Sequence, residues 1–141
     1  LVQNRILPAV GQCLMEEKIP LSLYKSIEQL CNRLDQIIPA ETPSLLHGDL
    51  WTGNVILSQH RKPYFIDPAC YYGLKENELA FSYLFGGFDA SFYDAYLEVC
   101  PILPGFGERV SVYHIHPLLV HIYYFGSGYI SGLERIIKRF S

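Results

Sequence analysis

Apolar side chains recur at helical spacing along much of the chain. From residue 23 to residue 38 they follow the i, i+3, i+4 pattern of an amphipathic helix, which Ser22 can cap and Pro39 ends. The apolar positions of this stripe are Tyr24, Ile27, Leu30, Cys31, Leu34, Ile37 and Ile38. The pattern also predicts further helices, over residues 2–15, 76–85, 91–99 and 108–140, with a break at the glycines of 126–132.

Two short β-type runs interrupt this helical pattern, at residues 55–57 and 64–66. The charged, turn-like segment 58–63 separates them, so an antiparallel hairpin is the simplest arrangement. Pairing about the middle of that turn places Val55 opposite Ile66 and Asn54 opposite Asp67. Directly opposed residues have Cβ atoms about 4.5–5.5 Å apart, so Asn54 and Asp67 are expected side by side. The predicted fold class is mainly α with a small β-hairpin.

Length and composition limit the class of protein. The 141 residues correspond to a single domain, 1–141, by the usual prior of roughly 100–200 residues per domain. Half of the residues are hydrophobic and 14% are aromatic, enough to bury a core and to exclude intrinsic disorder. The charge is mildly acidic, with 11 Lys and Arg against 14 Asp and Glu, and the basic residues form no run. No nucleic-acid partner is therefore expected.

Two features bear on the compartment. The 24 residues between Arg109 and Glu134 carry no Asp, Glu, Lys or Arg, which is long enough to span a bilayer. They are rich in His, Ser, Gly and Tyr, so buried core helices and no membrane span are expected. The four cysteines form no CxxC pair, which predicts buried free thiols in a reducing compartment, by default the cytoplasm.

The polar segment 47–54, His-Gly-Asp-Leu-Trp-Thr-Gly-Asn, carries the candidate chemistry. Asn54 and Asp67 would form a pair of hard oxygen ligands of the kind that Mg²⁺ uses beside substrate phosphates. Asp49, five residues before Asn54, adds a carboxylate that could accept the proton of an attacking hydroxyl in phosphoryl transfer. Each of these residues is also a common turn former, and His47 taken alone is more typical of a hydrogen-bonded structural histidine.

The combined pattern resembles a known family. Segment 47–54 followed by Tyr-Phe-Ile-Asp-Pro-Ala matches, in order and spacing, the H-x-D-x-x-x-x-N loop and later Asp of protein kinases and aminoglycoside-type phosphotransferases. Together with IDPACYYG, ENELAF and FGGF it resembles the fructosamine kinase (ketosamine kinase) family, from Asn4 to about His121. The resemblance implies ATP-dependent phosphorylation of a sugar hydroxyl on ketosamines, the fructosamine or ribulosamine adducts of free or protein-bound lysine.

The resemblance also implies roles for the residues of the loop. Asp49 would be the catalytic base, and His47 would orient the loop around it. Asn54 and Asp67 would hold Mg²⁺ bridging the ATP phosphates. Glu78 stands where related kinases keep an acid that braces the backbone of the catalytic loop, though a plain exposed glutamate is the alternative.

Two further residues are candidate substrate contacts. Trp51 stands where protein kinases often have a lysine, and its flat indole could pack on a sugar ring or simply anchor the loop. His121 lies in the last stretch that matches the family and would border the substrate cleft.

A kinase of this kind also needs a small lobe with a phosphate-covering loop and a lysine that pairs with ATP. Neither precedes His47, and the chain begins at Leu1 rather than at Met. The expectation is a protein-kinase-like C-terminal lobe without its N-terminal ATP-binding lobe, with little activity alone and an exposed apolar interlobe face. A truncated non-catalytic binding module and a phosphotransferase acting on an antibiotic, choline or another small alcohol remain the alternatives.

Overall fold

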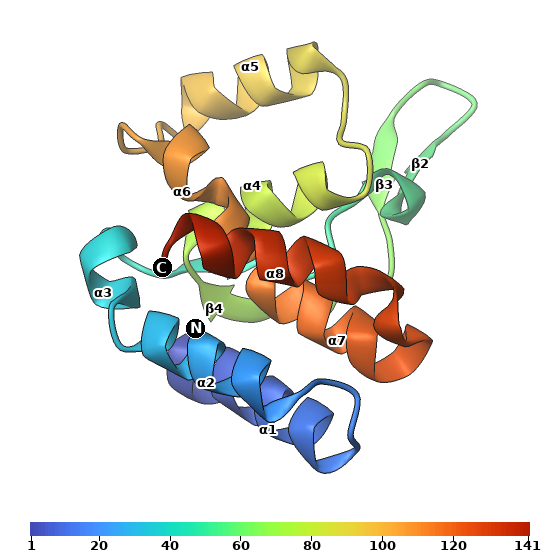
Figure 1. The fold of residues 1–141 in the computed structure, drawn as a ribbon. Helices are drawn as coiled ribbons and strands as arrows, with labels where there is room; N and C mark the ends of the chain where they lie inside the picture. Colours follow the sequence, from blue (N-terminus) through green and yellow to red (C-terminus); the bar gives the residue numbers. More distant parts are fainter. The chain divides into compact units, whose positions relative to one another are not determined.

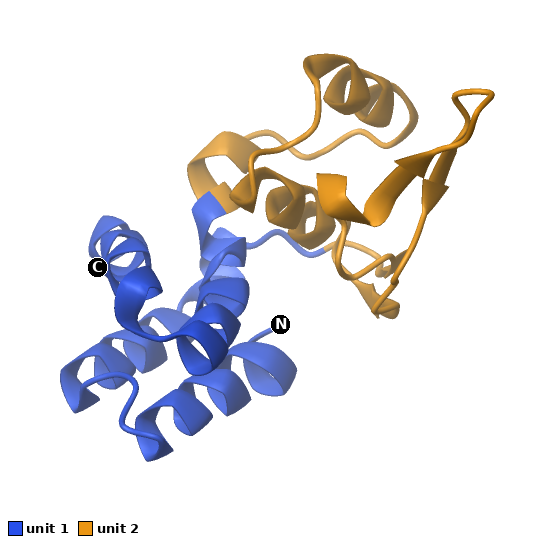
Figure 2. Ribbon diagram, turned by 90° about the vertical axis from the view of Figure 1, so that its right-hand side faces the viewer, with its two compact units in different colours: residues 1–40, 111–141 blue, residues 41–110 orange.

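The computed structural model describes residues 1–141, which form two compact units (Figure 1). Unit 1 contains residues 1–40 and 111–141, and unit 2 contains residues 41–110; Figure 2 colours them separately. Helices dominate, and the only sheets are two-stranded and antiparallel. The prediction of a mainly α fold with a small β component is confirmed.

Unit 1 is helical throughout. Its α1 contacts α2 and α7, α7 contacts α8, and α8 contacts α2, so apolar faces from both ends of the chain share one core. The fully buried side chains of this core include Ile6, Val10, Ile27, Leu119, Ile122 and Leu133. Its elements are a π-helix (Val2–Ile6), α1 (Leu7–Met15), α2 (Leu21–Cys31), α3 (Leu34–Ile37), α7 (Ile115–Phe125), a 3₁₀ turn (Ser127–Tyr129) and α8 (Ile130–Arg139).

The predicted helix over residues 23–38 is wrong in its middle and at its start. The chain leaves helical geometry at Arg33, with φ −120° and ψ 0°, and this separates α2 from α3. The helix begins directly after Pro20, whose ψ of 154° is extended, so Ser22 lies inside the first turn and caps nothing. The carbonyl of Ser22 instead accepts a hydrogen bond of 3.1 Å from the Ser26 hydroxyl.

The uncharged stretch after Arg109 forms separate short helices. It is divided at His114 between α6 (Phe106–Tyr113) and α7, and again at the glycines after Phe125. No helix of the structure has both the length and the apolar character needed to cross a membrane.

Within α7, burial lowers the pKa of His116 to about 4, and the positive charge of Arg5 adds to this effect. This histidine is therefore neutral at pH 7.

Unit 2 nests one antiparallel ladder inside another. The outer ladder pairs β1 (Ser44–Leu46) with β4 (Tyr71–Gly73), and the inner hairpin pairs β2 (Val55–Leu57) with β3 (Pro63–Phe65). A 3₁₀ turn, Thr52–Asn54, precedes β2. The outer ladder was not predicted, because its strands are only three residues long. One of them also lies in a run where hydrophobic and polar residues alternate only weakly.

The register of the inner hairpin differs by one residue from the prediction. Val55 pairs with Phe65, and the amide of Ile66 donates to the carbonyl of Asn54 at 3.0 Å, so Asn54 stands opposite Ile66 rather than Asp67. The turn is the cause. Ser58 pairs with Lys62 through a 2.9 Å bond, leaving an odd number of loop residues, and Arg61 takes a left-handed φ of 57° as in a three-residue hairpin loop.

Helices α4 (Lys75–Leu84) and α5 (Ala90–Val99) complete unit 2, together with the first residues of α6. Tyr93 of α5 joins α4 and α5: its ring stacks on Tyr83 at 4.2 Å, and its hydroxyl lies 3.2 Å from that of Ser82. The same hydroxyl accepts the amide of Phe88 at 3.0 Å. These contacts hold α4, α5 and the turn between them together.

The cysteines are all free, as predicted, but they are not all buried. Cys13 and Cys31 lie in the core of unit 1, where burial raises their pKa values, to about 11 for Cys31. Cys70, three residues after Asp67, is exposed.

Candidate functional site

The segment 47–54 runs from the end of β1 to the start of β2, and both of its ends are hydrogen-bonded to the segment 66–69 between β3 and β4. At one end the amide of Ala69 donates to the carbonyl of His47 at 2.8 Å. At the other end the amide of Ile66 donates to the carbonyl of Asn54 at 3.0 Å. Asp67 lies between these two attachments. The nested ladders therefore hold the segment with Asp49 and the segment with Asp67 in one part of unit 2.

The imidazole of His47 connects these two segments. Its Nδ1 accepts the backbone N–H of Asp49 at 3.3 Å, and its Nε2 lies 3.0 Å from the carbonyl oxygen of Ile66. Because Nδ1 is an acceptor, Nε2 must carry the hydrogen and donate it to that carbonyl. Both ring nitrogens are thus engaged by backbone groups, and the His47 side chain ties Asp49 to the segment at Ile66.

Asn54 is buried and directs its amide group at Asp49. Its Nδ2 donates to the carbonyl oxygen of Asp49 at 2.9 Å and to the carboxylate Oδ2 of Asp49 at 2.8 Å. The two hydrogens of the amide are therefore used, and Oδ1 of Asn54 is the atom left to act as a ligand. The same contacts orient the Asp49 carboxylate through its Oδ2.

Asp67 is exposed and has a left-handed backbone, with φ 50°. Aspartate tolerates this conformation better than most residues. Its carboxylate and Oδ1 of Asn54 are hard oxygen donors of the type that suits Mg²⁺. No three His, Cys, Asp or Glu side chains lie together in a way that could hold a metal ion. Mg²⁺ commonly takes only one or two protein ligands and keeps waters and substrate phosphates as the others, so two oxygen donors are a sufficient protein contribution.

Glu78 on α4 holds the start of the loop. Its Oε1 accepts the amide of His47 at 2.6 Å and its Oε2 accepts the amide of Gly48 at 2.7 Å. Gly48 has φ 84°, and a Cβ on it would lie 2.1 Å from the carbonyl oxygen of Ala69. Only glycine fits there, because any side chain would drive the loop away from the segment 66–69.

Tyr71 and Asn77 belong to this arrangement although the sequence did not single them out. The ring of Tyr71 lies over Gly48, 3.2 Å from the position of a Cβ there, and its hydroxyl accepts a 2.6 Å bond from Nδ2 of Asn77. No signal in the sequence marks this contact, because polar residues are common in the first turn of any helix.

Trp51 lies on the loop itself. Its indole covers Gly53, so that a Cβ on Gly53 would fall 2.3 Å from the ring, and its edge meets the ring of Phe85 at 6.4 Å between centroids. The side chain is nevertheless 38% exposed. Trp51 therefore anchors the loop and still offers aromatic surface to a ligand.

His121 belongs to unit 1, on α7. Its ring contacts those of Phe125 and Tyr129, at 5.4 and 5.1 Å between centroids, and its Nδ1 lies 2.8 Å from the carbonyl oxygen of Pro117. The loop with Asp49 belongs to unit 2. The proximity of His121 to a substrate cleft stays a prediction.

Comparison with known proteins identifies the family. The family model described as fructosamine kinase matches residues 2–141. The chain belongs to the fructosamine kinase family. A ketosamine-3-kinase of Mus musculus is 46% identical over 99 residues, covering 70% of this chain and 32% of the mouse protein. A probable ketoamine kinase of Enterococcus faecium is 44% identical over 99 residues, covering 70% of this chain and 36% of that protein.

Solved structures of the fructosamine kinase family agree. A crystallised fructosamine-3-kinase homologue from Thermobifida fusca superposes with a TM-score of 0.89 at 33% identity, over 97% of this chain and 48% of that chain. A homologue from Haemophilus somnus gives 0.80 at 32% identity, over 99% and 47%. The chain thus spans about a third of the length of the curated relatives and about half of each solved structure.

Proposed function

We propose that this chain carries the catalytic side of an ATP-dependent kinase that phosphorylates a sugar hydroxyl of ketosamines. The observation that carries the proposal is the pair of hydrogen bonds from Nδ2 of Asn54 to Asp49, at 2.9 and 2.8 Å. This pair joins a carboxylate suited to accept a proton to an amide oxygen suited to a metal ion. The family names of the relatives, which include a ketosamine-3-kinase and a protein-ribulosamine 3-kinase, supply the substrate class.

In the proposed mechanism Asp49 is the general base. Asn54 occupies its Oδ2, so Oδ1 accepts the proton of the sugar hydroxyl. The hydroxyl oxygen attacks the γ-phosphorus of ATP, and ADP leaves. His47 and Glu78 keep the loop in this geometry by holding the amides of Asp49, His47 and Gly48. Positioning of this kind is the main contribution that a protein makes to phosphoryl transfer.

Asn54 and Asp67 would hold Mg²⁺ through Oδ1 and the carboxylate. The bound ion would neutralise the charge of the ATP phosphates. Asn54 presents its oxygen because Asp49 takes both of its amide hydrogens. The left-handed backbone of Asp67 is retained because the attachments at Ile66 and Ala69 enclose it.

The exposed face of the Trp51 indole is the proposed platform for the sugar ring, and His121 is a second proposed substrate contact. Aromatic faces pack well on the C–H surface of a sugar.

The remaining contacts that bind ATP would come from an N-terminal lobe outside this chain. The exposed apolar side chains of the inner hairpin, Ile56, Leu57, Tyr64 and Phe65, provide a surface for it. The proposed compartment is the cytoplasm, where the free thiols persist.

The proposal is tested by supplying the full-length protein with ATP, Mg²⁺ and one acceptor at a time. The acceptors are fructosyl-lysine, ribulosyl-lysine, unmodified lysine, an aminoglycoside and choline, and the phosphorylated product is measured by mass spectrometry. We expect phosphate transfer to the two ketosamines and none to lysine, and little transfer by residues 1–141 alone. Transfer only to the aminoglycoside or choline would indicate the alternative phosphotransferase, and no transfer to any acceptor would indicate a binding module.

A further inference from the structure

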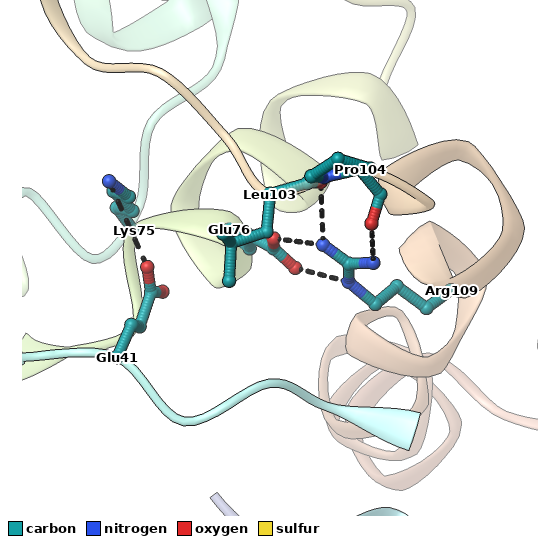
Figure 3. A network of polar contacts seen from close by, with 6 residues as sticks. All are labelled: Glu41, Lys75, Glu76, Leu103, Pro104 and Arg109. Carbon is teal, nitrogen blue, oxygen red and sulfur yellow. Dashed lines mark hydrogen bonds and ion pairs between the residues drawn. The ribbon is translucent and has the colours of Figure 1, made fainter. Parts of the chain in front are cut away.

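Outside the proposed site, unit 2 contains a buried ion pair between Glu76 on α4 and Arg109 on α6 (Figure 3). Glu76 is 1% exposed and Arg109 is 8% exposed. The guanidinium binds the carboxylate in bidentate fashion: Nε donates to Oε2 at 2.8 Å, and the Nη2 group donates to Oε1. Such a fork fixes direction as well as distance.

Two further donors of Arg109 bind the turn before α6. Nη1 donates to the carbonyl of Pro104 at 2.7 Å, and Nη2 donates to that of Leu103 at 2.9 Å, as Figure 3 shows. Gly105 allows this turn, because its φ of 83° brings it close to Nη1 of Arg109, where a Cβ would lie 3.0 Å away. The turn, Arg109 and the start of α4 thus form one hydrogen-bonded cluster.

The first turn of α4 links this cluster to the loop 47–54. Glu76 binds Arg109, Asn77 binds the hydroxyl of Tyr71, and Glu78 binds the amides at the start of the loop. These are consecutive residues, so the position of one dictates the position of the next two. A rotation of this turn that released Glu76 would also withdraw the Glu78 carboxylate from its bonds of 2.6 and 2.7 Å.

We propose that Arg109 is a positioning residue for phosphoryl transfer, acting through Glu76 and Glu78 on the backbone of His47 and Gly48. The proposal rests on the proposed function. A role in stability alone explains the pair poorly, since apolar residues of similar volume often stabilise a core as well as a buried ion pair does. A bidentate pair with two further carbonyl contacts instead determines where the first turn of α4 lies.

The test replaces Arg109 by Lys in the full-length protein. Lysine keeps the charge but cannot reach Glu76, Leu103 and Pro104 together. We expect kcat for ketosamine phosphorylation to fall about tenfold with KM for ATP unchanged, because small displacements of a catalytic group cost rate rather than binding. Arg135→Lys, at an exposed position of α8, is the matched control and should leave kcat unchanged. If Arg109→Lys does not fold, Glu76→Gln, which keeps the shape and weakens the pair, takes its place.

A double-mutant cycle with Glu78→Gln separates positioning from stability. If Arg109 acts through Glu78, the double variant will lose little more kcat than Glu78→Gln alone. If the losses of kcat in the two single variants multiplied in the double variant, the proposal would be overturned. A lower melting temperature of Arg109→Lys with unchanged kcat would also overturn it.

An NMR readout is independent of turnover. Arg109→Lys should shift the amide proton resonances of His47 and Gly48 upfield as their bonds to Glu78 lengthen, whereas Arg135→Lys should not. Unmoved resonances would overturn the positioning role even in an active enzyme. Shifted resonances in a protein that phosphorylates no ketosamine would overturn the proposed function and leave the structural link intact.

Discussion

Replacing Asp49 by Asn in the full-length protein is expected to lower kcat for ketosamine phosphorylation about a thousandfold, within the range that general bases contribute. The substitution keeps the size of the side chain and an oxygen that can accept the 2.8 Å bond from Asn54. It removes the ability to accept a proton from the sugar hydroxyl. KM for ATP should change little, because Asp49 is not a proposed ligand of the nucleotide.

The control for this change is Asp94→Asn, an equivalent substitution at an exposed position of α5 in the same unit. Rates would be compared by quantifying the phosphorylated ketosamine at saturating ATP. If Asp49→Asn turned over as fast as Asp94→Asn, Asp49 could not be the base.

The second large effect concerns stability. Replacing Gly48 by Ala should lower the free energy of unfolding by about 3 kcal/mol, the size expected of backbone strain combined with a steric clash. An alanine there would adopt an unfavourable φ of 84° and bring its Cβ within 2.1 Å of the Ala69 carbonyl oxygen. Relief of this clash requires the loop to move away from the segment 66–69, so activity should fall in the fraction that remains folded.

Gly107→Ala is the matched control for Gly48→Ala. A Cβ at Gly107 would meet no atom within 4 Å, and the residue lies in α6, where alanine is the better helix former by up to about 1 kcal/mol. Urea denaturation should therefore show this variant as stable as the natural protein or more so. Equal midpoints for both alanine variants would show that the loop does not need glycine at position 48.

Local patterns along the chain predicted the family and most of the elements. The stripe from Tyr24 to Leu30 predicted α2, because burial of one helix face leaves a 3.6-residue period in the sequence. The hairpin was also predicted, but its register was wrong by one residue. Register depends on the number of turn residues, and the left-handed Arg61 that makes this number odd carries no Gly or Asn signal.

The residues of the candidate site were predicted from the sequence, and only the family resemblance suggested that Glu78 lies against the loop backbone. The spacing of Asp49, Asn54 and Asp67 is local, so a motif reveals it. The contacts that hold them are not local: Glu78 reaches back 31 residues to the amide of His47, and Arg109 reaches back 33 to Glu76. No periodicity encodes such pairs, because they depend on how α4 and α6 pack after the chain has folded.

The most direct test of the account is the Mg²⁺ dependence of phosphoryl transfer to a ketosamine in the full-length protein with Asp67 replaced by Asn. If Asp67 and Oδ1 of Asn54 hold the ion beside Asp49, the half-saturating Mg²⁺ concentration should rise at least about tenfold, as expected for loss of a charged ligand. Asp94→Asn should leave that concentration unchanged. A Mg²⁺ curve for Asp67→Asn that coincided with that of the natural protein would contradict the account.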